Sequence, residues 1–175
     1  PPEDLENAYE SLSPEDQTVL QRVAARIRSF AEAQKNSLKS LSVPIPGGFA
    51  GHDILPVETA GCYAPGGRFP LPSSVLMTAI PARVAGVKHV IVASPKPTRH
   101  TLAAAYLAGA DGVLCIGGAQ AVGALASGIC DFPPADMIVG PGNRWVTAAK
   151  QIISGRIGID MLAGPSELMI VADDS

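Results

Sequence analysis

Charged residues are scarce in this sequence, and neither sign dominates. Asp, Glu, Lys and Arg make up 17% of the 175 residues, and the formal net charge at pH 7 is −3. A chain with this balance lacks the bulk positive charge that attracts nucleic acid or an anionic membrane surface. The composition therefore argues against both as partners.

Long hydrophobic runs and paired cysteines are missing as well. Arg83 and Lys88 interrupt the longest apolar candidates, so no segment approaches the ~20 apolar residues that span a membrane. The acidic, polar first residues are unlike a signal peptide. Cys62, Cys115 and Cys130 form no CxxC pair, which favours a reducing compartment, and we expect a cytoplasmic protein. Cys115 lies within an apolar run and is predicted to belong to the core.

Motifs for metal binding and nucleophilic catalysis are also lacking. His52, His89 and His100 share no ligand spacing with cysteines or carboxylates, and none follows a predicted strand as a catalytic histidine would. The glycine fingerprint GxGxxG of dinucleotide-binding folds is absent. These residues alone thus predict neither a catalytic set, nor a metal site, nor a standard Rossmann cofactor site.

Hydrophobic residues, in contrast, are abundant at 47%, which suits parallel strands covered on both faces. Beyond residue 56, short apolar runs alternate with stretches of helical periodicity. This alternation predicts βαβ units, and hence an α/β fold with a Rossmann-like, mostly parallel sheet and flanking helices. We expect strands over 57–63, 88–93, 112–116, 136–139, 157–160 and 168–172, and helices over 73–85, 98–107, 119–126 and 143–153.

A helical arm precedes this region. The run Ser13-Pro14-Glu15-Asp16 combines a hydroxyl N-cap, a proline at the first helical position and acids in the first turn. Apolar residues then recur at helical spacing, which predicts a helix to about residue 34. Residues 35–56 show no sustained period and are expected to form an extended connection. The sequence thus divides into an N-terminal helix and extended linker over 1–56 and a Rossmann-like domain over 57–175.

Four loops rich in glycine and proline follow the predicted strands. Right-handed crossovers place all strand-to-helix loops at one edge of the sheet, where ligands bind in open α/β folds. Glycine lets backbone approach a ligand closely, and proline fixes the turn. We therefore expect an elongated ligand across the carboxyl ends of the strands. The loops cover residues 64–67, 94–97, 117–120 and 140–143.

Several residues near this edge have more than one interpretation. Asn143 can cap the following helix, or it can also contact a ligand together with the free N–H groups of that helix. Gln120 stands among small residues that leave room for a ring or ribose, yet it can equally be a surface residue. Tyr63, at a strand end, either packs in the core or faces the ligand. Lys150 is interpreted as a partner of the helix dipole rather than a catalyst.

Together, several blocks of this sequence resemble the histidinol dehydrogenase family. The similarity extends from the first helix to Ser175, with the blocks in the family's order and close to its spacing. The blocks are Gly61-Cys62-Tyr63-Ala64-Pro65-Gly66-Gly67, Pro72-Ser73-Ser74, Gly117-Gly118-Ala119-Gln120-Ala121, Val139-Gly140-Pro141-Gly142-Asn143 and Ile159-Asp160-Met161-Leu162-Ala163-Gly164-Pro165-Ser166-Glu167.

The resemblance implies a zinc-containing homodimer that oxidises L-histidinol, or a similar amino alcohol, to the amino acid in two NAD-dependent steps through an aldehyde, in histidine biosynthesis. Carried over by motif, Tyr63, Gln120 and Asn143 correspond to positions that contact NAD, and Ser166 to one that contacts the substrate. The family's zinc ligands and its Glu-His acid–base pair lie downstream of the Gly-Pro-Ser-Glu block. The resemblance therefore assigns no catalytic or metal-ligating residue within 1–175. The isolated chain is expected to hold the NAD-binding part, over 57–175, and to be inactive on its own.

Local departures from the family pattern leave two alternatives open. Leu162 stands where the family usually has proline, and the segment Gly128-Ile129-Cys130-Asp131 differs from the usual Gly-Thr-Glu. A related dehydrogenase of another small polar alcohol would fit these departures. A non-catalytic nucleotide-binding or interaction module that kept the fold is the second alternative.

Overall fold

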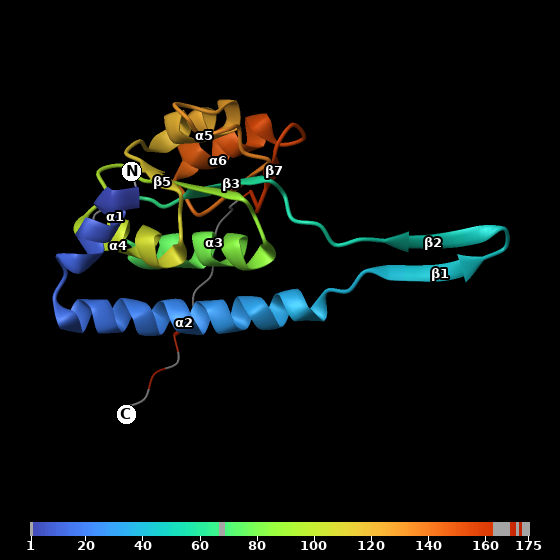
Figure 1. Cartoon of the computed structure of the whole chain (residues 1–175). Coiled ribbons are helices and arrows are strands. Elements are labelled where there is room, and N and C mark those ends of the chain that lie inside the picture. The colour runs from blue at the N-terminus through green and yellow to red at the C-terminus, as the bar shows by residue number, and fades with distance from the viewer. Residues whose placement is uncertain (1, 67–68, 163–168, 171, 173–175) are drawn as a thin grey trace.

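The computed structural model describes residues 2–66, 69–162, 169–170 and 172. Its centre is a five-stranded parallel sheet of strand order β5-β4-β3-β6-β7, with helices on both faces (Figure 1). This arrangement confirms the predicted α/β, Rossmann-like fold. The strands are β3 (Thr59–Tyr63), β4 (His89–Ala93), β5 (Gly112–Leu114), β6 (Met137–Val139) and β7 (Gly158–Ile159), and the helices between them are α3 (Pro72–Ala85), α4 (Arg99–Ala108), α5 (Gly118–Ser127) and α6 (Arg144–Ile153).

The order of the strands decides which helices cover which face. The chain winds outward from β3 through β4 to β5, then returns to β6 beside β3 and continues to β7. Because each crossover is right-handed, the two directions of winding place their helices on opposite faces. Figure 1 shows α3 and α4 on one face and α5 and α6 on the other. The winding reverses between β3 and β6, and such a switch point is where open α/β sheets bind ligands.

Strand β3 is buried along its whole length, and its residues before Tyr63 are small. A Cβ on Gly61 would lie 3.0 Å from the Leu125 side chain, so the glycine lets α5 approach the sheet closely. Cys62, on the strand's other face, is fully buried, and this burial raises the pKa of its thiol to about 12. The prediction that Cys115 belongs to the core is wrong: β5 ends at Leu114, and Cys115 is exposed in the loop that follows.

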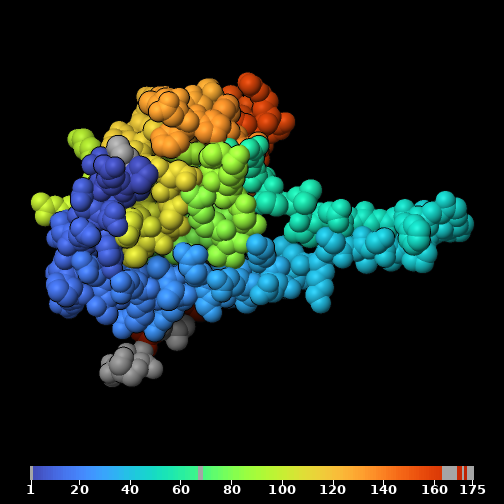
Figure 2. Space-filling view, viewed as in Figure 1, coloured from blue at the N-terminus to red at the C-terminus, as the bar shows by residue number. Residues whose placement is uncertain are grey.

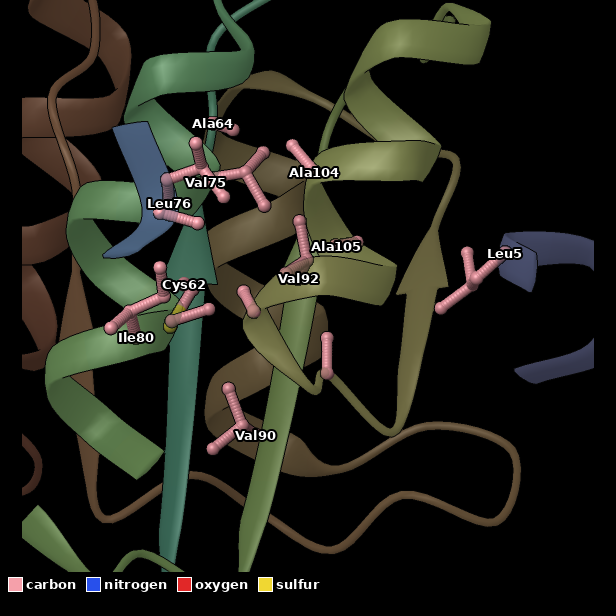
Figure 3. Packing of buried hydrophobic residues seen from close by; sticks show 14 of the residues in the cluster. Leu5, Cys62, Ala64, Val75, Leu76, Ile80, Val90, Val92, Ala104 and Ala105 are labelled. Atoms are coloured by element: carbon pink, nitrogen blue, oxygen red, sulfur yellow. The ribbon is translucent and has the colours of Figure 1, made fainter. Parts of the chain in front are cut away.

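The larger part of the core lies between β3, β4 and the helices α3 and α4. Figure 3 shows Ile80 of α3 beside Cys62 of β3, and Val92 of β4 beside Ala105 of α4. Helix α1 (Pro2–Glu10) extends this cluster from outside, where its Leu5 is 2% exposed. A continuous apolar cluster thus joins the N-terminal residues to the sheet.

Two N-terminal helices precede the sheet. Helix α2 (Pro14–Ser37) begins as predicted, with the Ser13 hydroxyl accepting the N–H of Asp16 at 3.1 Å, and it lies along α3 (Figure 1). It continues three residues past the predicted end. Helix α1 is absent from the sequence-based expectations because it is short and polar, with only Leu5 and Ala8 buried. Within the described ranges, no helix combines the length and apolarity needed to cross a membrane.

The extended connection expected over 35–56 contains a β-hairpin that the sequence analysis did not predict. Strands β1 (Leu41–Ile45) and β2 (Gly48–His52) pair antiparallel across Pro46 and Gly47, and Gly47 supplies the positive φ of 87° that the turn requires. All ten strand residues are exposed, and the hairpin projects away from the rest of the molecule (Figures 1 and 2).

Residues 168 and 171 of the strand predicted over 168–172 lie outside the described residues. Met169, Ile170 and Ala172 are described, and none of them lies in a strand. The remaining predicted strands and helices between residues 57 and 160 are confirmed, with boundaries that differ by up to two residues.

The ends of β3 and β6 lie in close contact. Gly140 directly follows β6 and has a φ of +117°. A Cβ at this position would lie 2.0 Å from the carbonyl oxygen of Tyr63 at the end of β3. Two features therefore require glycine at position 140: the positive φ of the backbone and the close approach of the neighbouring strand.

Replacing Ile80 by alanine is expected to lower the free energy of unfolding by about 2–5 kcal/mol, because the side chain is fully buried between the helix and the sheet. Met77→Ala in the same helix is the matched control, since that side chain is 61% exposed, and it should change stability by only about 0.5 kcal/mol. Urea unfolding of both variants measures the difference. Equal losses would show that the core is not placed as described.

Gly140→Ala is expected to destabilise the protein more than Gly155→Ala. Gly155 also has a positive φ, of 93°, but a Cβ there would meet nothing within 4 Å, so this variant reports backbone strain alone, about 1–2 kcal/mol. The additional loss at residue 140 reports the contact with Tyr63. Thermal and urea unfolding compare the two variants, and a smaller loss for Gly140→Ala would contradict the close approach of the strand ends.

Candidate functional site

The three residues predicted to contact a nucleotide all lie on the carboxyl edge of the sheet. Tyr63 is the last residue of β3, Gln120 lies in the first turn of α5, and Asn143 directly precedes α6. Tyr63 is buried, whereas Gln120 and Asn143 are exposed. Ser166, the predicted substrate residue, lies outside the described residues.

Tyr63 is the point at which these segments meet. Its hydroxyl accepts the backbone N–H of Gly118, at the start of α5, at 3.2 Å. Its carbonyl oxygen faces Gly140, in the loop that leads to Asn143. The structure thus brings the loop after β5 and the loop after β6 to one residue of β3, at the switch point of the sheet.

The two interpretations of Tyr63 are compatible. The ring packs in a cluster with Ala121, Val122 and Val146 from the helices α5 and α6. The hydroxyl uses its oxygen to accept the Gly118 N–H, so its own hydrogen remains a donor. Tyr63 can therefore be a core residue and present a polar group at the ligand edge.

Asn143 caps helix α6, which confirms one of its two interpretations. Its Oδ1 accepts the N–H groups of Trp145 and Val146 at 3.0 and 3.2 Å. The cap uses the amide oxygen and leaves the side-chain NH2 as a donor. The capping role therefore leaves a ligand role open.

Glycines in the other loops serve contacts between loops. A Cβ on Gly66 would lie 2.2 Å from the carbonyl oxygen of Pro95, and one on Gly117 would lie 2.6 Å from the Pro95 ring. Pro95 follows β4, which is the strand between β3 and β5. The loop after β4 thus fits between the loops that follow β3 and β5. These two glycines therefore let the backbone pack closely at this edge.

An ion pair at the same edge, between a buried lysine and a partly exposed aspartate, was not predicted. Lys150 of α6 is 3% exposed, and its Nζ lies 2.5 Å from Oδ1 of Asp160, the residue after β7. The interpretation of Lys150 as a partner of the helix dipole alone is therefore incomplete. A signal was present in the sequence, because Val146, Lys150 and Ile153 recur at helical spacing and place the lysine on the apolar face.

The charge of Asp160 is stabilised by its neighbours. Burial acts to raise the pKa of this carboxyl group, but the Lys150 ammonium and the backbone N–H groups of Gly140 and Met161 outweigh it and lower the pKa below its ordinary value. The carboxylate is consequently ionised at neutral pH.

The donor set at this edge suits a dinucleotide and not a metal ion. A nucleotide offers phosphate, hydroxyl and amide groups that hydrogen-bond to donors such as those of Tyr63, Gln120 and Asn143. Among the described residues, no three His, Cys, Asp or Glu side chains lie close enough together to hold a metal ion.

A groove of about 870 Å³ is lined by residues of α2, α3 and β6 and reaches Asp160 at the carboxyl edge. Its lining is mostly apolar and includes Leu55, Met77 and Val139 but not Tyr63, Gln120 or Asn143. Such a lining offers few hydrogen bonds for phosphate or ribose. The carboxyl edge remains the better candidate for nucleotide binding.

Comparison with known proteins identifies the family. The family model described as histidinol dehydrogenase matches residues 1–175. The chain is 49% identical to the histidinol dehydrogenase of Cupriavidus pinatubonensis over 97% of its own length, and 48% identical to that of Methanococcus maripaludis over 99%. It spans only 40% and 42% of the lengths of these two relatives.

The fold agrees with this similarity. A crystal structure of histidinol dehydrogenase from Elizabethkingia anophelis superposes on the chain with a TM-score of 0.83 at 36% sequence identity, and it covers 94% of this chain and 39% of its own. The matched family model, the two relatives and the shared structure lead to the same conclusion. The chain belongs to the histidinol dehydrogenase family.

Proposed function

We propose that the protein is an NAD-dependent dehydrogenase that oxidises L-histidinol to L-histidine through an aldehyde, and that residues 57–175 bind the NAD. The observation that supports this most directly is the meeting, at the switch point, of Tyr63 with the loops that carry Gln120 and Asn143. Family membership supplies the reaction class. The chain spans about 40% of its curated relatives, so the activity is a proposal for the complete protein.

Each of the three residues has a defined part in this proposal. The Tyr63 hydroxyl, fixed by the Gly118 N–H, donates its hydrogen to the nucleotide, and the Asn143 NH2 donates from the start of α6. Gln120 is exposed in the first turn of α5 and can both donate and accept. Bound NAD supplies the hydride acceptor for the alcohol carbon. Among the described residues no three His, Cys, Asp or Glu side chains gather, so this part of the proposal concerns the nucleotide alone.

The remaining expectations extend this proposal beyond the nucleotide site. We propose that residues 1–56 support the nucleotide-binding part rather than contact NAD, that Ser166 contacts the alcohol, and that the complete protein is a homodimer. Light scattering of the complete protein tests the last point directly.

Gln120→Ala is expected to weaken NAD binding about fivefold to tenfold, the loss of one or two hydrogen bonds. Because the side chain is exposed, the thermal midpoint should stay within about 2 °C of the wild type. Asn143→Ser keeps a side-chain cap for α6 while removing the NH2 donor, so it should weaken NAD binding with little loss of stability. Calorimetric titration with NAD measures both variants.

The wild-type chain of residues 1–175 serves as a further control: it is expected to bind NAD yet to form no NADH from L-histidinol, even with zinc added. Unchanged NAD affinity in both Gln120→Ala and Asn143→Ser would contradict the proposed site. NADH formation by the isolated chain would contradict the expectation that the catalytic groups lie outside it.

A second candidate differs only in the alcohol. The chain is also 41% identical to a protein of Mesorhizobium japonicum named histidinol dehydrogenase homolog 1, so similarity at this level extends beyond proteins named as histidinol dehydrogenases themselves. Steady-state kinetics of the complete protein with L-histidinol and with other small polar alcohols separates the two. A higher kcat/KM for another alcohol would favour the second candidate.

A further inference from the structure

The ion pair of Lys150 and Asp160 holds the backbone of Gly140 from both sides. The Lys150 Nζ donates to the Gly140 carbonyl oxygen at 2.7 Å, and the Gly140 N–H donates to Oδ2 of Asp160 at 2.8 Å. With the contact between Lys150 and Asp160, these bonds form a closed triangle between α6, the loop after β6 and the end of β7. Both peptide groups of a residue in an unusual conformation are thus fixed by two charged side chains.

The carboxylate of Asp160 also binds the backbone that follows β7. Oδ1 of Asp160 accepts the N–H of Met161 at 2.8 Å, so the backbone that leaves β7 is held by the atom that contacts Lys150. The loop held on one side runs to Asn143, a proposed NAD contact. The pair therefore joins this loop to the first residues after β7.

Stability alone does not account for this arrangement. Burying an ammonium group is costly, and buried ion pairs are often no better for stability than apolar residues of similar size. Lys150 lies on the apolar face of α6 between Val146 and Ile153, where a methionine would pack without this cost. What an apolar residue cannot do is hold the carbonyl group of Gly140.

A second ion pair in the molecule offers a comparison. Arg83 and Asp111 lie 2.6 Å apart, and they also bind backbone: Arg83 donates to the carbonyl oxygens of Gly109 and Lys88, and Asp111 accepts the N–H of Val90. This pair lies at the amino ends of β4 and β5, away from the ligand edge. Each of these two ion pairs thus binds backbone groups, one pair at the carboxyl edge of the sheet and the other at the amino edge.

We propose that Lys150 and Asp160 are positioning residues, which hold the loop 140–143 and the start of the loop after β7 in the geometry that binds the nucleotide. The proposal rests on the proposed function, because it assumes that this loop contacts NAD. Neither side chain needs to touch the nucleotide itself.

The test uses Lys150→Met and Asp160→Asn in the complete protein. Each is expected to raise the dissociation constant for NAD about tenfold, and the double variant should bind about as well as the weaker single variant, because the two residues act through one unit. Asp160→Asn keeps an acceptor for the Gly140 N–H and the shape of the side chain, so it remains informative if Lys150→Met fails to fold. The KM for NAD should rise more than kcat falls.

Arg83→Met and Asp111→Asn are the matched controls. They should lower the thermal midpoint at least as much as the Lys150 and Asp160 variants do. They should nevertheless leave the dissociation constant for NAD within about twofold of the wild type, since this ion pair lies at the opposite edge of the sheet. Hydrogen exchange without nucleotide gives a second readout. Lys150→Met and Asp160→Asn should speed exchange at Gly140 and its loop about tenfold while β4 stays protected, and the controls should leave that loop unchanged.

The outcomes separate the two proposals. If the Lys150 and Asp160 variants lose thermal stability but keep the wild-type affinity for NAD and the wild-type exchange at Gly140, the positioning role is overturned and the proposed function stands. If the wild-type protein does not bind NAD, the proposed function fails, together with the purpose assigned to the pair. Weaker NAD binding with faster exchange confined to the loop supports the positioning role.

Discussion

Burial of strand β3 on both faces is the constraint on which the ligand edge depends. Helices cover this strand on either side, and its middle residues Ala60, Gly61 and Cys62 are small. The missing side chain of Gly61 lets Leu125 pack against the strand, which brings helix α5 close to the sheet. Only at this depth does the first turn of α5 reach the Tyr63 hydroxyl. The geometry of the candidate site therefore depends on the packing of the core around β3.

The sheet and its helices were predictable from the sequence because their signals are local. Apolar runs and helical periods between residues 57 and 160 each belong to a single element, as do the caps at Ser13 and Asn143. The hairpin was missed for a physical reason: Leu41, Val43 and Ile45 alternate as a strand would, but Pro44 interrupts the pattern and argues against a strand inside a sheet. In a hairpin of two strands each strand is an edge, where proline is tolerated.

The candidate site was predictable only in part. The resemblance identified Tyr63, Gln120 and Asn143, but a motif does not show that two loops meet at Tyr63. The spacing of Lys150 marks it as buried, whereas its partner Asp160 belongs to another element and no local pattern joins them. The prediction that Cys115 is buried failed because apolar neighbours in the sequence do not show where a strand ends. Such pairings and ends depend on tertiary contacts, which the sequence does not display.

The contacts between the loops bear on how the edge would bind a nucleotide. Pro95 fits between Gly66 and Gly117, Gly140 lies against Tyr63, and neither arrangement leaves room for a side chain on the glycine. A backbone held in this way is ordered during folding, so ligand binding does not have to bear that entropic cost. The exposed side chain of Gln120 is then the adaptable group on a rigid edge, since the Asn143 side chain is held by the cap of α6. The described residues thus contribute a closely packed edge, on which the proposed nucleotide contacts lie.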